Sequence, residues 1–222
     1  MTPLQRKQIV DSQRGAWRQH GFHPNALFWS SKEVQYLRFE VLMDVFDQRD
    51  MAETKSVLDI GCGFGEFADY MSGQGVNIAY TGIDLSSELI TEGQKRYPEI
   101  NLIEADLFEF DPADNSYDYV FLSGALNRQL NDNGDYAYRT IKRMFEVSKK
   151  GVAFNLLNAN HEWTASRWDL QSFNPDDVMD YVTKLLPSEL LNKRSSHVII
   201  RDDYLENDFT VLLDKQALVN EH

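Results

Sequence analysis

A glycine-rich turn at residues 61–65 constrains the fold of this chain more than any other sequence feature. The preceding residues 56–60, Ser-Val-Leu-Asp-Ile, form a short apolar run that is typical of a buried strand. A helical pattern follows, with Phe67, Ala68 and Met71 on one face. A strand that turns through glycines into a helix is the opening unit of an open α/β sheet. It marks the edge at which such a sheet binds its ligand.

Strand-like and helical patterns alternate along most of the chain. The expected strands are residues 56–60, 78–84, 101–104, 117–123, 150–157, 197–201 and 208–213. The loop between the last two strands has six residues, which is too short for a parallel crossover. We therefore predict an α/β fold with a doubly wound, mostly parallel seven-stranded sheet and an antiparallel C-terminal hairpin.

The length of 222 residues fits one large domain. Residues 1–50 carry a separate helical pattern, which we expect to form an N-terminal helical cap over the ligand edge of the same domain. Residues 51–222 form the predicted Rossmann-like core. The chain has one cysteine, Cys62, so an internal disulfide is excluded. No apolar run reaches the length of a signal peptide or a membrane span, so we expect a cytoplasmic protein without a membrane partner.

The formal net charge of −13 is unevenly distributed, because residues 1–38 carry six basic and two acidic residues. The rest of the chain is strongly acidic, and such a body repels nucleic acid, so DNA or RNA is not an expected partner. The basic N-terminal segment has two interpretations. It docks on the acidic body, or it contacts an anionic group of the substrate.

A dinucleotide-dependent oxidoreductase is the first alternative for a glycine loop in this position. Its fingerprint, G-x-G-x-x-G, requires a glycine at position 66, where this chain has Glu66. The third glycine is Gly65, one residue early, and an acid beside the loop disfavours a pyrophosphate. Spacing and charge therefore favour a cationic ligand that carries no phosphate.

Acidic side chains follow three consecutive predicted strands. Asp59 lies in the first strand, Asp84 ends the second, and Asp106 follows the third. The carboxyl ends of neighbouring parallel strands meet at one edge of a sheet, so these acids should surround a common crevice. Asp84 would accept hydrogen bonds from two ribose hydroxyls. The pattern predicts an adenosine pocket.

Four segments resemble the successive cofactor motifs of class I S-adenosylmethionine-dependent methyltransferases: VLDIGCGFGEF, TGIDLS, EADLFEF and YDYVFLSGALN. The resemblance covers about residues 54–213. It implies S-adenosylmethionine as the cofactor, and methyl transfer by in-line displacement as the reaction. A non-catalytic regulatory protein that retains the fold and the cofactor is a further alternative.

The resemblance also implies roles for individual residues. The methionine moiety would be lined by Asp59, Gly61, Cys62, Gly63, Phe64 and Gly65. Asp84 would hold the ribose and Leu85 would pack on the adenine. Asp106 and the Leu107 amide would read the amino edge of the adenine, and Ser123 would border the methyl group. Trp29 and Arg38 of the cap would meet the carboxylate end of the cofactor, although an amphipathic helix also explains both residues.

The methyl acceptor is less well defined, because displacement from a sulfonium needs no fixed catalytic signature. Methylation of exocyclic amines in nucleic-acid bases goes with an Asn/Asp-Pro-Pro-aromatic stretch, but residues 122–125 read Leu-Ser-Gly-Ala. We therefore expect a small-molecule acceptor that is methylated on oxygen or nitrogen. The candidate acceptor residues are Asn127, Arg128, His161 and Trp163, with His161 also a weak candidate for a general base. No tight cluster of acids and histidines stands out, so no metal is expected.

Overall fold

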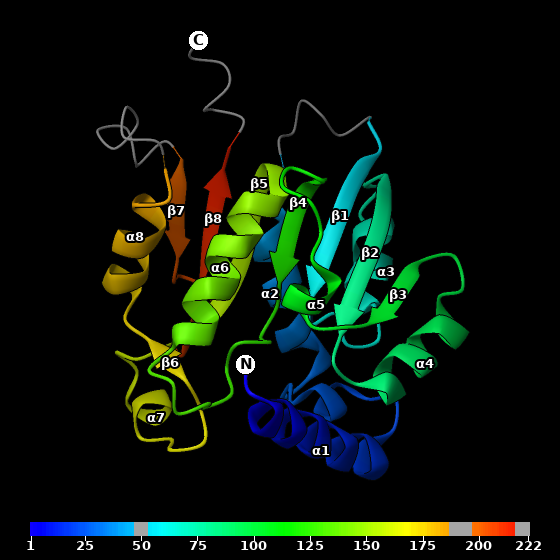
Figure 1. The fold of residues 1–222 in the computed structure, drawn as a ribbon, viewed down its shortest axis with the longest axis horizontal. Coiled ribbons are helices and arrows are strands. Elements are labelled where there is room, and N and C mark those ends of the chain that lie inside the picture. The colour runs from blue at the N-terminus through cyan, green and yellow to red at the C-terminus, as the bar shows by residue number, and fades with distance from the viewer. Residues whose placement is uncertain (47–52, 187–196, 216–222) are drawn as a thin grey trace.

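A mixed β-sheet runs through the middle of the computed structural model, which describes residues 1–46, 53–186 and 197–215 (Figure 1). Its strands are β1 (Lys55–Ile60), β2 (Ile78–Asp84), β3 (Asn101–Glu104), β4 (Tyr117–Leu122), β5 (Ser148–Asn158), β6 (Ser172–Phe173), β7 (Val198–Arg201) and β8 (Asp208–Asp214). They lie in the order β3-β2-β1-β4-β5-β8-β7, and β6 pairs with β5 off this path. The strand order reverses direction at β1, which is where open α/β sheets bind ligands.

Strands β1 to β5 pair in parallel, and β8 runs antiparallel to both β5 and β7. The predicted mostly parallel sheet with an antiparallel C-terminal hairpin is therefore confirmed. The two-residue strand β6 was not predicted. It adds an eighth strand by pairing in parallel with the end of β5, at Leu157 and Asn158. A strand of two residues has no alternation for a sequence pattern to reveal.

Helices cover both faces of the sheet (Figure 1). Their bounds are α1 (Pro3–His20), η1 (Pro24–Leu27), α2 (Lys32–Met43), α3 (Glu66–Gly73), α4 (Ser87–Arg96), α5 (Leu107–Phe110), α6 (Asp135–Val147), α7 (Glu162–Ala165) and α8 (Pro175–Thr183). One core cluster joins α6 and α8 to the sheet, and the other joins α2, α3 and α4 to the opposite face. None of the helices in the described ranges is both long and apolar enough to cross a bilayer.

The N-terminal segment, which we predicted to be one cap, has two parts. Helix α1 lies across the edge toward which β1, β2 and β4 point (Figure 1), and η1 packs against it. Helix α2 instead packs on a face of the sheet, because its apolar side, including Phe39 and Leu42, joins the core that contains Phe67. The cap therefore consists of α1 and η1, and α2 belongs to the core layer.

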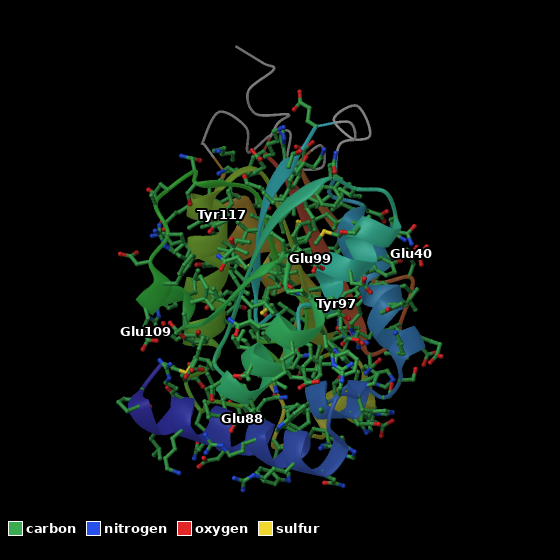
Figure 2. The ribbon with its side chains drawn as sticks, turned by 90° about the vertical axis from the view of Figure 1, so that its right-hand side faces the viewer. Glu40, Glu88, Tyr97, Glu99, Glu109 and Tyr117 are labelled. Carbon is green, nitrogen blue, oxygen red and sulfur yellow. The ribbon has the colours of Figure 1, made fainter. Side chains whose placement is uncertain are left out.

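Helix α1 is attached to the acidic body by ion pairs. Arg6 pairs with Glu109 on α5, and Arg14 Nε lies 2.5 Å from an oxygen of Glu88 on α4. Both carboxylates lie along the side of the molecule that faces α1 (Figure 2). These contacts support the first interpretation of the basic N-terminal segment. They are exposed to solvent, which screens them, so each contributes little to stability.

Close packing between α4 and the glycine loop gives a test of the fold. A Cβ at Gly93 would lie 2.4 Å from the backbone oxygen of Phe64, whereas a Cβ at Gly15 of α1 would meet nothing within 4 Å. We expect Gly93→Ala to lower the free energy of unfolding by about 1–3 kcal/mol through overpacking. The matched control, Gly15→Ala, should raise it by about 0.5–1 kcal/mol through helix propensity. Urea denaturation measures both effects, and an unchanged stability of Gly93→Ala would show that α4 moves freely away from the loop.

Candidate functional site

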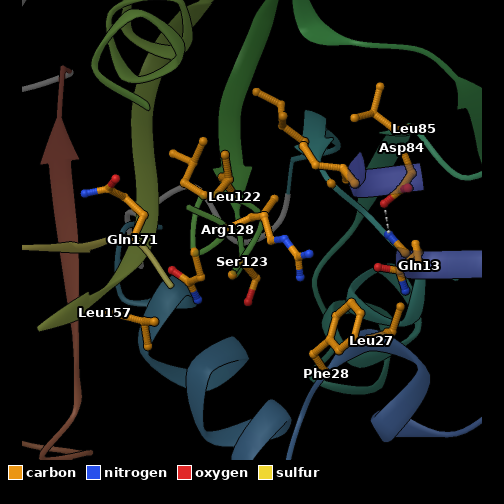
Figure 3. A pocket seen from close by; sticks show the side chains of 18 of the residues that line it. Gln13, Leu27, Phe28, Asp84, Leu85, Leu122, Ser123, Arg128, Leu157 and Gln171 are labelled. Atoms are coloured by element: carbon orange, nitrogen blue, oxygen red, sulfur yellow. Dashed lines mark hydrogen bonds between the residues drawn. The ribbon is translucent and has the colours of Figure 1, made fainter. Parts of the chain in front are cut away.

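A cavity of about 760 Å³ lies where the carboxyl ends of β1, β2 and β4 meet the N-terminal cap (Figure 3). Three groups of residues form its walls. The glycine loop after β1 contributes Gly61 and Gly63, the end of β2 and the loop after β3 contribute Asp84 and Asp106, and residues 27–38 contribute Trp29 and Arg38. The cavity is therefore at the edge that the strand–glycine–helix pattern predicted.

Glycines are required in this loop because other chain segments approach it closely. Gly61 and Gly63 have φ angles of +71° and +58°, which non-glycine residues rarely adopt. A Cβ at Gly61 would lie 2.3 Å from the Cβ of Ala125, and one at Gly63 would lie 2.9 Å from Leu27. Glycine is therefore required at both positions, by the backbone conformation and by the close packing of Ala125 and Leu27.

Asp84, at the end of β2, holds the glycine loop in place. One carboxylate oxygen accepts a hydrogen bond from the Gly63 amide at 3.0 Å, and the other accepts from the Ser86 amide at 2.8 Å. Burial raises the pKa of Asp84, and the backbone hydrogen bonds oppose that shift. Each oxygen has a further lone pair, so the side chain could still accept hydrogen bonds from a ligand.

Asp106 occupies the equivalent position after β3. One of its oxygens accepts from the Phe108 amide at the start of α5, and the other accepts from the Tyr136 hydroxyl at 2.6 Å. Burial and the hydrogen bond to Asp106 raise the pKa of Tyr136, so this hydroxyl remains protonated and donates. The apolar side chains of Leu85 and Leu107 line the same end of the cavity.

Asp59 is a buried acid on the cavity wall with an incomplete set of partners. The Tyr80 hydroxyl donates to its Oδ2 at 2.5 Å, but its Oδ1 has no hydrogen-bond partner among the described residues. Burial raises the pKa of Asp59 to about 7, and the hydrogen bond from Tyr80 opposes the shift. The site therefore holds a carboxylate for which a positively charged donor would be a favourable neighbour.

Two further cavity residues present buried acceptor oxygens without a donor. These atoms are Gln35 Oε1 and Asn127 Oδ1. Together with Asp59 Oδ1 they are the three unpartnered amide or carboxylate oxygens on described residues that line the cavity. A buried polar atom left without a partner costs about 1–3 kcal/mol, so the cavity favours a ligand that brings N–H or O–H donors. This chemistry suits a cationic ligand and disfavours a pyrophosphate.

Arg38 and Trp29 both line the cavity, and Arg38 also has a structural partner. Its Nε donates to Asp208 at the start of β8, and its guanidinium stacks 4.6 Å from the centre of the Trp29 ring. Both members of the ion pair are buried. Burial raises the pKa of Asp208 to about 6 although Arg38 lowers it. The predicted contact between Arg38 and a ligand carboxylate would use the other nitrogens of the guanidinium group, and it stays a prediction.

Two glycine-loop residues do not line the cavity, which corrects the predicted set. Phe64 is fully buried and packs its ring against Phe22 and Trp17, with centroid distances of 4.8 and 5.6 Å. Gly65 faces Ile100 instead. The loop turns at this point, so Phe64 packs against the cap and Gly65 packs against Ile100 and Leu102, and their contact with a ligand stays a prediction. Cys62 does line the cavity, and burial raises the pKa of its thiol.

The residues predicted for an acceptor site are only partly brought together. Ser123, Asn127, Arg128 and Trp163 line the cavity, and Arg128 donates to Ser12 of α1 at 3.3 Å. His161 does not line it, because this residue caps α7 and its Nε2 lies 3.9 Å from Glu206. Positions two apart on a helix do not face the same way, so Trp163 reaches the cavity and His161 does not. His161 therefore lies outside the cavity wall, and its role as a general base stays a prediction that this arrangement does not support.

Two residues that line the cavity, Gln35 and Tyr136, had no predicted role. Gln35 lies with Arg38 on the buried side of α2 among apolar residues, and a polar residue at such a position is a signal that the sequence does contain. Tyr136 contacts Asp106, which is 30 residues earlier in the sequence, and nothing in the sequence pattern indicates this pair.

Comparisons with known proteins agree with this geometry. A profile of the methyltransferase domain family matches residues 57–151. A protein of Mycobacterium tuberculosis that bears a methyltransferase name is 27% identical over 170 residues, which cover 75% of this chain and 96% of that protein. The trans-aconitate 2-methyltransferase of Afipia carboxidovorans is 29% identical over 89 residues, which cover 38% of this chain and 34% of that protein.

Among solved structures, magnesium protoporphyrin IX methyltransferase from Synechocystis PCC 6803 superimposes with a TM-score of 0.62. The sequence identity is 13%, and the match covers 95% of this chain and 97% of that chain. This likeness shows a shared fold that extends over the cap and the C-terminal hairpin.

The buried ion pair makes a prediction about stability. Arg38→Met should lower the free energy of unfolding by about 3–5 kcal/mol, because it leaves the Asp208 carboxylate buried without its cation. Adding Asp208→Asn to that variant should recover most of the loss. The control is Arg201→Met, which breaks half-exposed pairs with Asp44 and Asp203 and should change stability by about 1 kcal/mol or less. If the double variant is no more stable than Arg38→Met, the ion pair is not the cause.

The raised pKa of Asp59 predicts a pH dependence of the ligand-free protein. Its carboxyl group ionises near pH 4 in the unfolded chain but near pH 7 in the fold. Its contribution to stability is therefore complete below pH 4 and is lost as the pH rises to about 7. Asp59→Asn keeps an acceptor for Tyr80 and should remove this loss, so its advantage over the wild type should grow to a few kcal/mol across that range. A stability difference that does not vary between pH 4 and pH 7, measured by denaturation, would contradict the assignment.

Proposed function

We propose that this chain is a class I S-adenosylmethionine-dependent methyltransferase that transfers the cofactor's methyl group to an oxygen or nitrogen atom of a small molecule. The observation that carries the proposal is the set of buried, unpartnered acceptor oxygens on cavity residues that surround the glycine loop. S-adenosylmethionine has a sulfonium and an ammonium group and no phosphate, so it suits this wall. A dinucleotide would bring a pyrophosphate toward the carboxyl groups of Asp59 and Asp84.

Each part of the cofactor has a candidate contact in the cavity. Asp84 would accept hydrogen bonds from the ribose hydroxyls while it holds the glycine loop. Asp106 and the Leu107 amide would read the amino edge of the adenine, against which Leu85 would pack. Gly61 and Gly63 would allow the methionine moiety to approach the backbone.

The residues at the other end of the cavity would orient the acceptor. When bound, S-adenosylmethionine would supply a methyl group on a sulfonium, from which an acceptor lone pair would displace the thioether in line. Asn127, Arg128 and Trp163 line the cavity beyond Ser123, where they would hold an acceptor in line with the methyl group. Such positioning contributes about 7–11 kcal/mol in well-oriented reactions and requires no catalytic base by itself.

A small acceptor fits the dimensions of the site. A cavity of about 760 Å³ is in the range of small-molecule sites, and the cofactor would occupy a large share of it. The trans-aconitate 2-methyltransferase of Afipia carboxidovorans takes, by its name, a small carboxylic acid. An acceptor of similar size suits this chain, and the acidic surface disfavours nucleic acid.

Calorimetry with three ligands tests the proposal. We expect S-adenosylmethionine and S-adenosylhomocysteine to bind with micromolar dissociation constants, and we expect NAD to show no binding. Binding of NAD alone would overturn the proposal in favour of an oxidoreductase. If none of the ligands binds, the cofactor assignment is wrong.

Asp84 gives the sharpest single-residue test. Asp84→Ala removes two charge-assisted hydrogen bonds to the ribose and should weaken S-adenosylhomocysteine by about 2–4 kcal/mol in calorimetry. The control is Asp118→Ala. Asp118 is also a partly buried carboxylate with backbone and hydroxyl partners, but it lies at the start of β4, away from the cavity. Equal losses of affinity in both variants would point to a general effect on the fold.

A further inference from the structure

Gln35 and Glu66 form a buried polar pair between the N-terminal segment and the glycine loop. Gln35 lies on α2 and Glu66 is the first residue of α3, and they are 1% and 6% exposed. The Gln35 Nε2 donates to the Glu66 Oε2 at 3.1 Å. Helix α2 is thereby joined to the residue that directly follows Gly65. The pair lies beside the cavity, and Gln35 is part of its wall.

The chemistry of the pair fixes the orientation of the Gln35 amide. A carboxylate has acceptors only, so Glu66 selects the rotamer in which Nε2 faces it and Oε1 points the other way. This Oε1 is buried and has no hydrogen-bond partner among the described residues. The opposite orientation would place two acceptor oxygens against each other. Glu66 therefore keeps an acceptor oxygen in a fixed position without a donor.

The position of Gln35 indicates which ligand group would supply that donor. Gln35 lies about one helical turn before Arg38, which stacks on Trp29 and pairs with Asp208 of β8, whereas Asp106 follows β3 at the far edge of the sheet. Asp59, with the second unpartnered acceptor, is on the strand that leads into the glycine loop. In S-adenosylmethionine the N–H donors are the adenine amino group at one end and the α-ammonium group at the other.

We propose that Gln35 accepts a hydrogen bond from the α-ammonium group of the cofactor and that Glu66 is the positioning residue that holds its amide. This inference rests on the proposed function, and it assigns to Gln35 the recognition of the cofactor's α-amino group. It makes the site discriminate against adenosyl thioethers that lack an amine. Asp59 lies along the same wall and would share the ammonium group.

The test compares two ligands that differ in one group. S-adenosylhomocysteine is measured against its deaminated analogue, in which hydrogen replaces the α-amino group, by calorimetry at constant pH and salt. The wild type should prefer the amine-bearing ligand by about 10- to 100-fold. Gln35→Met has a similar size and no acceptor oxygen, and it should lower this preference by about 10-fold. Affinity for the deaminated analogue should change by less than about 2-fold.

Two other variants separate recognition from packing. In Glu66→Gln the partner amide both donates and accepts, so the Gln35 orientation is no longer enforced. The preference should fall by a few-fold while the analogue binds as before. Gln94→Met is the matched control, because Gln94 on α4 donates to the Leu102 carbonyl at 2.9 Å and does not line the cavity. This control should keep the full preference.

The outcomes decide the proposal in each case. If Gln35→Met weakens both ligands equally, or leaves the preference unchanged, Gln35 does not contact the ammonium group. If Gln35→Met does not fold, as judged by its thermal unfolding, Glu66→Gln decides by the same comparison. Failure of the wild type to bind S-adenosylhomocysteine at all would overturn the proposed function instead, so the two failures are distinguishable.

Discussion

The close packing of the backbone around the glycine loop is the constraint on which the rest of the site depends. The amides of Gly61 and Cys62 both donate to the carbonyl of Ile83, at 2.8 and 3.0 Å, so the loop after β1 is fixed to the end of β2. Ala125 and Leu27 then approach the loop from two sides, at positions where a side chain would collide. The cavity, the start of α3 and the attachment of the cap all follow from this arrangement. A larger residue would therefore disturb the fold and the site together.

Buried acids are the second constraint, and they link stability to binding. Asp59 and Asp84 lie close to each other in a region of low dielectric, so burial raises the pKa of both. The ligand-free protein therefore contains carboxylates whose ionisation is unfavourable, together with acceptor oxygens that have no donors. A cation that binds there supplies both the charge and the donors. Such a ligand stabilises the fold because it binds the native state alone.

The sequence predicted those features that arise from short-range patterns. Alternating runs located the strands, and the acids at strand ends located the cavity, because parallel strands bring their carboxyl ends together. Tertiary packing determines the features that the sequence did not reveal. Arg38 and Asp208 are 170 residues apart, and only the folded chain brings α2 against β8. Phe64 lies within the most specific motif, yet its ring turns away from the cavity because the cap offers Phe22 and Trp17 as neighbours. Sequence spacing does not show the direction in which a loop residue points.

The two ends of the cavity are built in different ways, and this difference explains why the acceptor is harder to predict than the cofactor. The proposed cofactor end is formed by loops that directly follow β1, β2 and β3, and the matched region, residues 57–151, contains all of them. The proposed acceptor end also depends on α1 and on residues 169–171, which lie outside that region. Those residues are held to the loop after β4 by isolated backbone hydrogen bonds, Gln171 N to Asn127 O at 2.9 Å and Gln129 N to Asp169 O at 3.2 Å. Segments attached in this way tolerate sequence change without loss of the sheet, so related chains with the same cofactor loops are free to bind different acceptors.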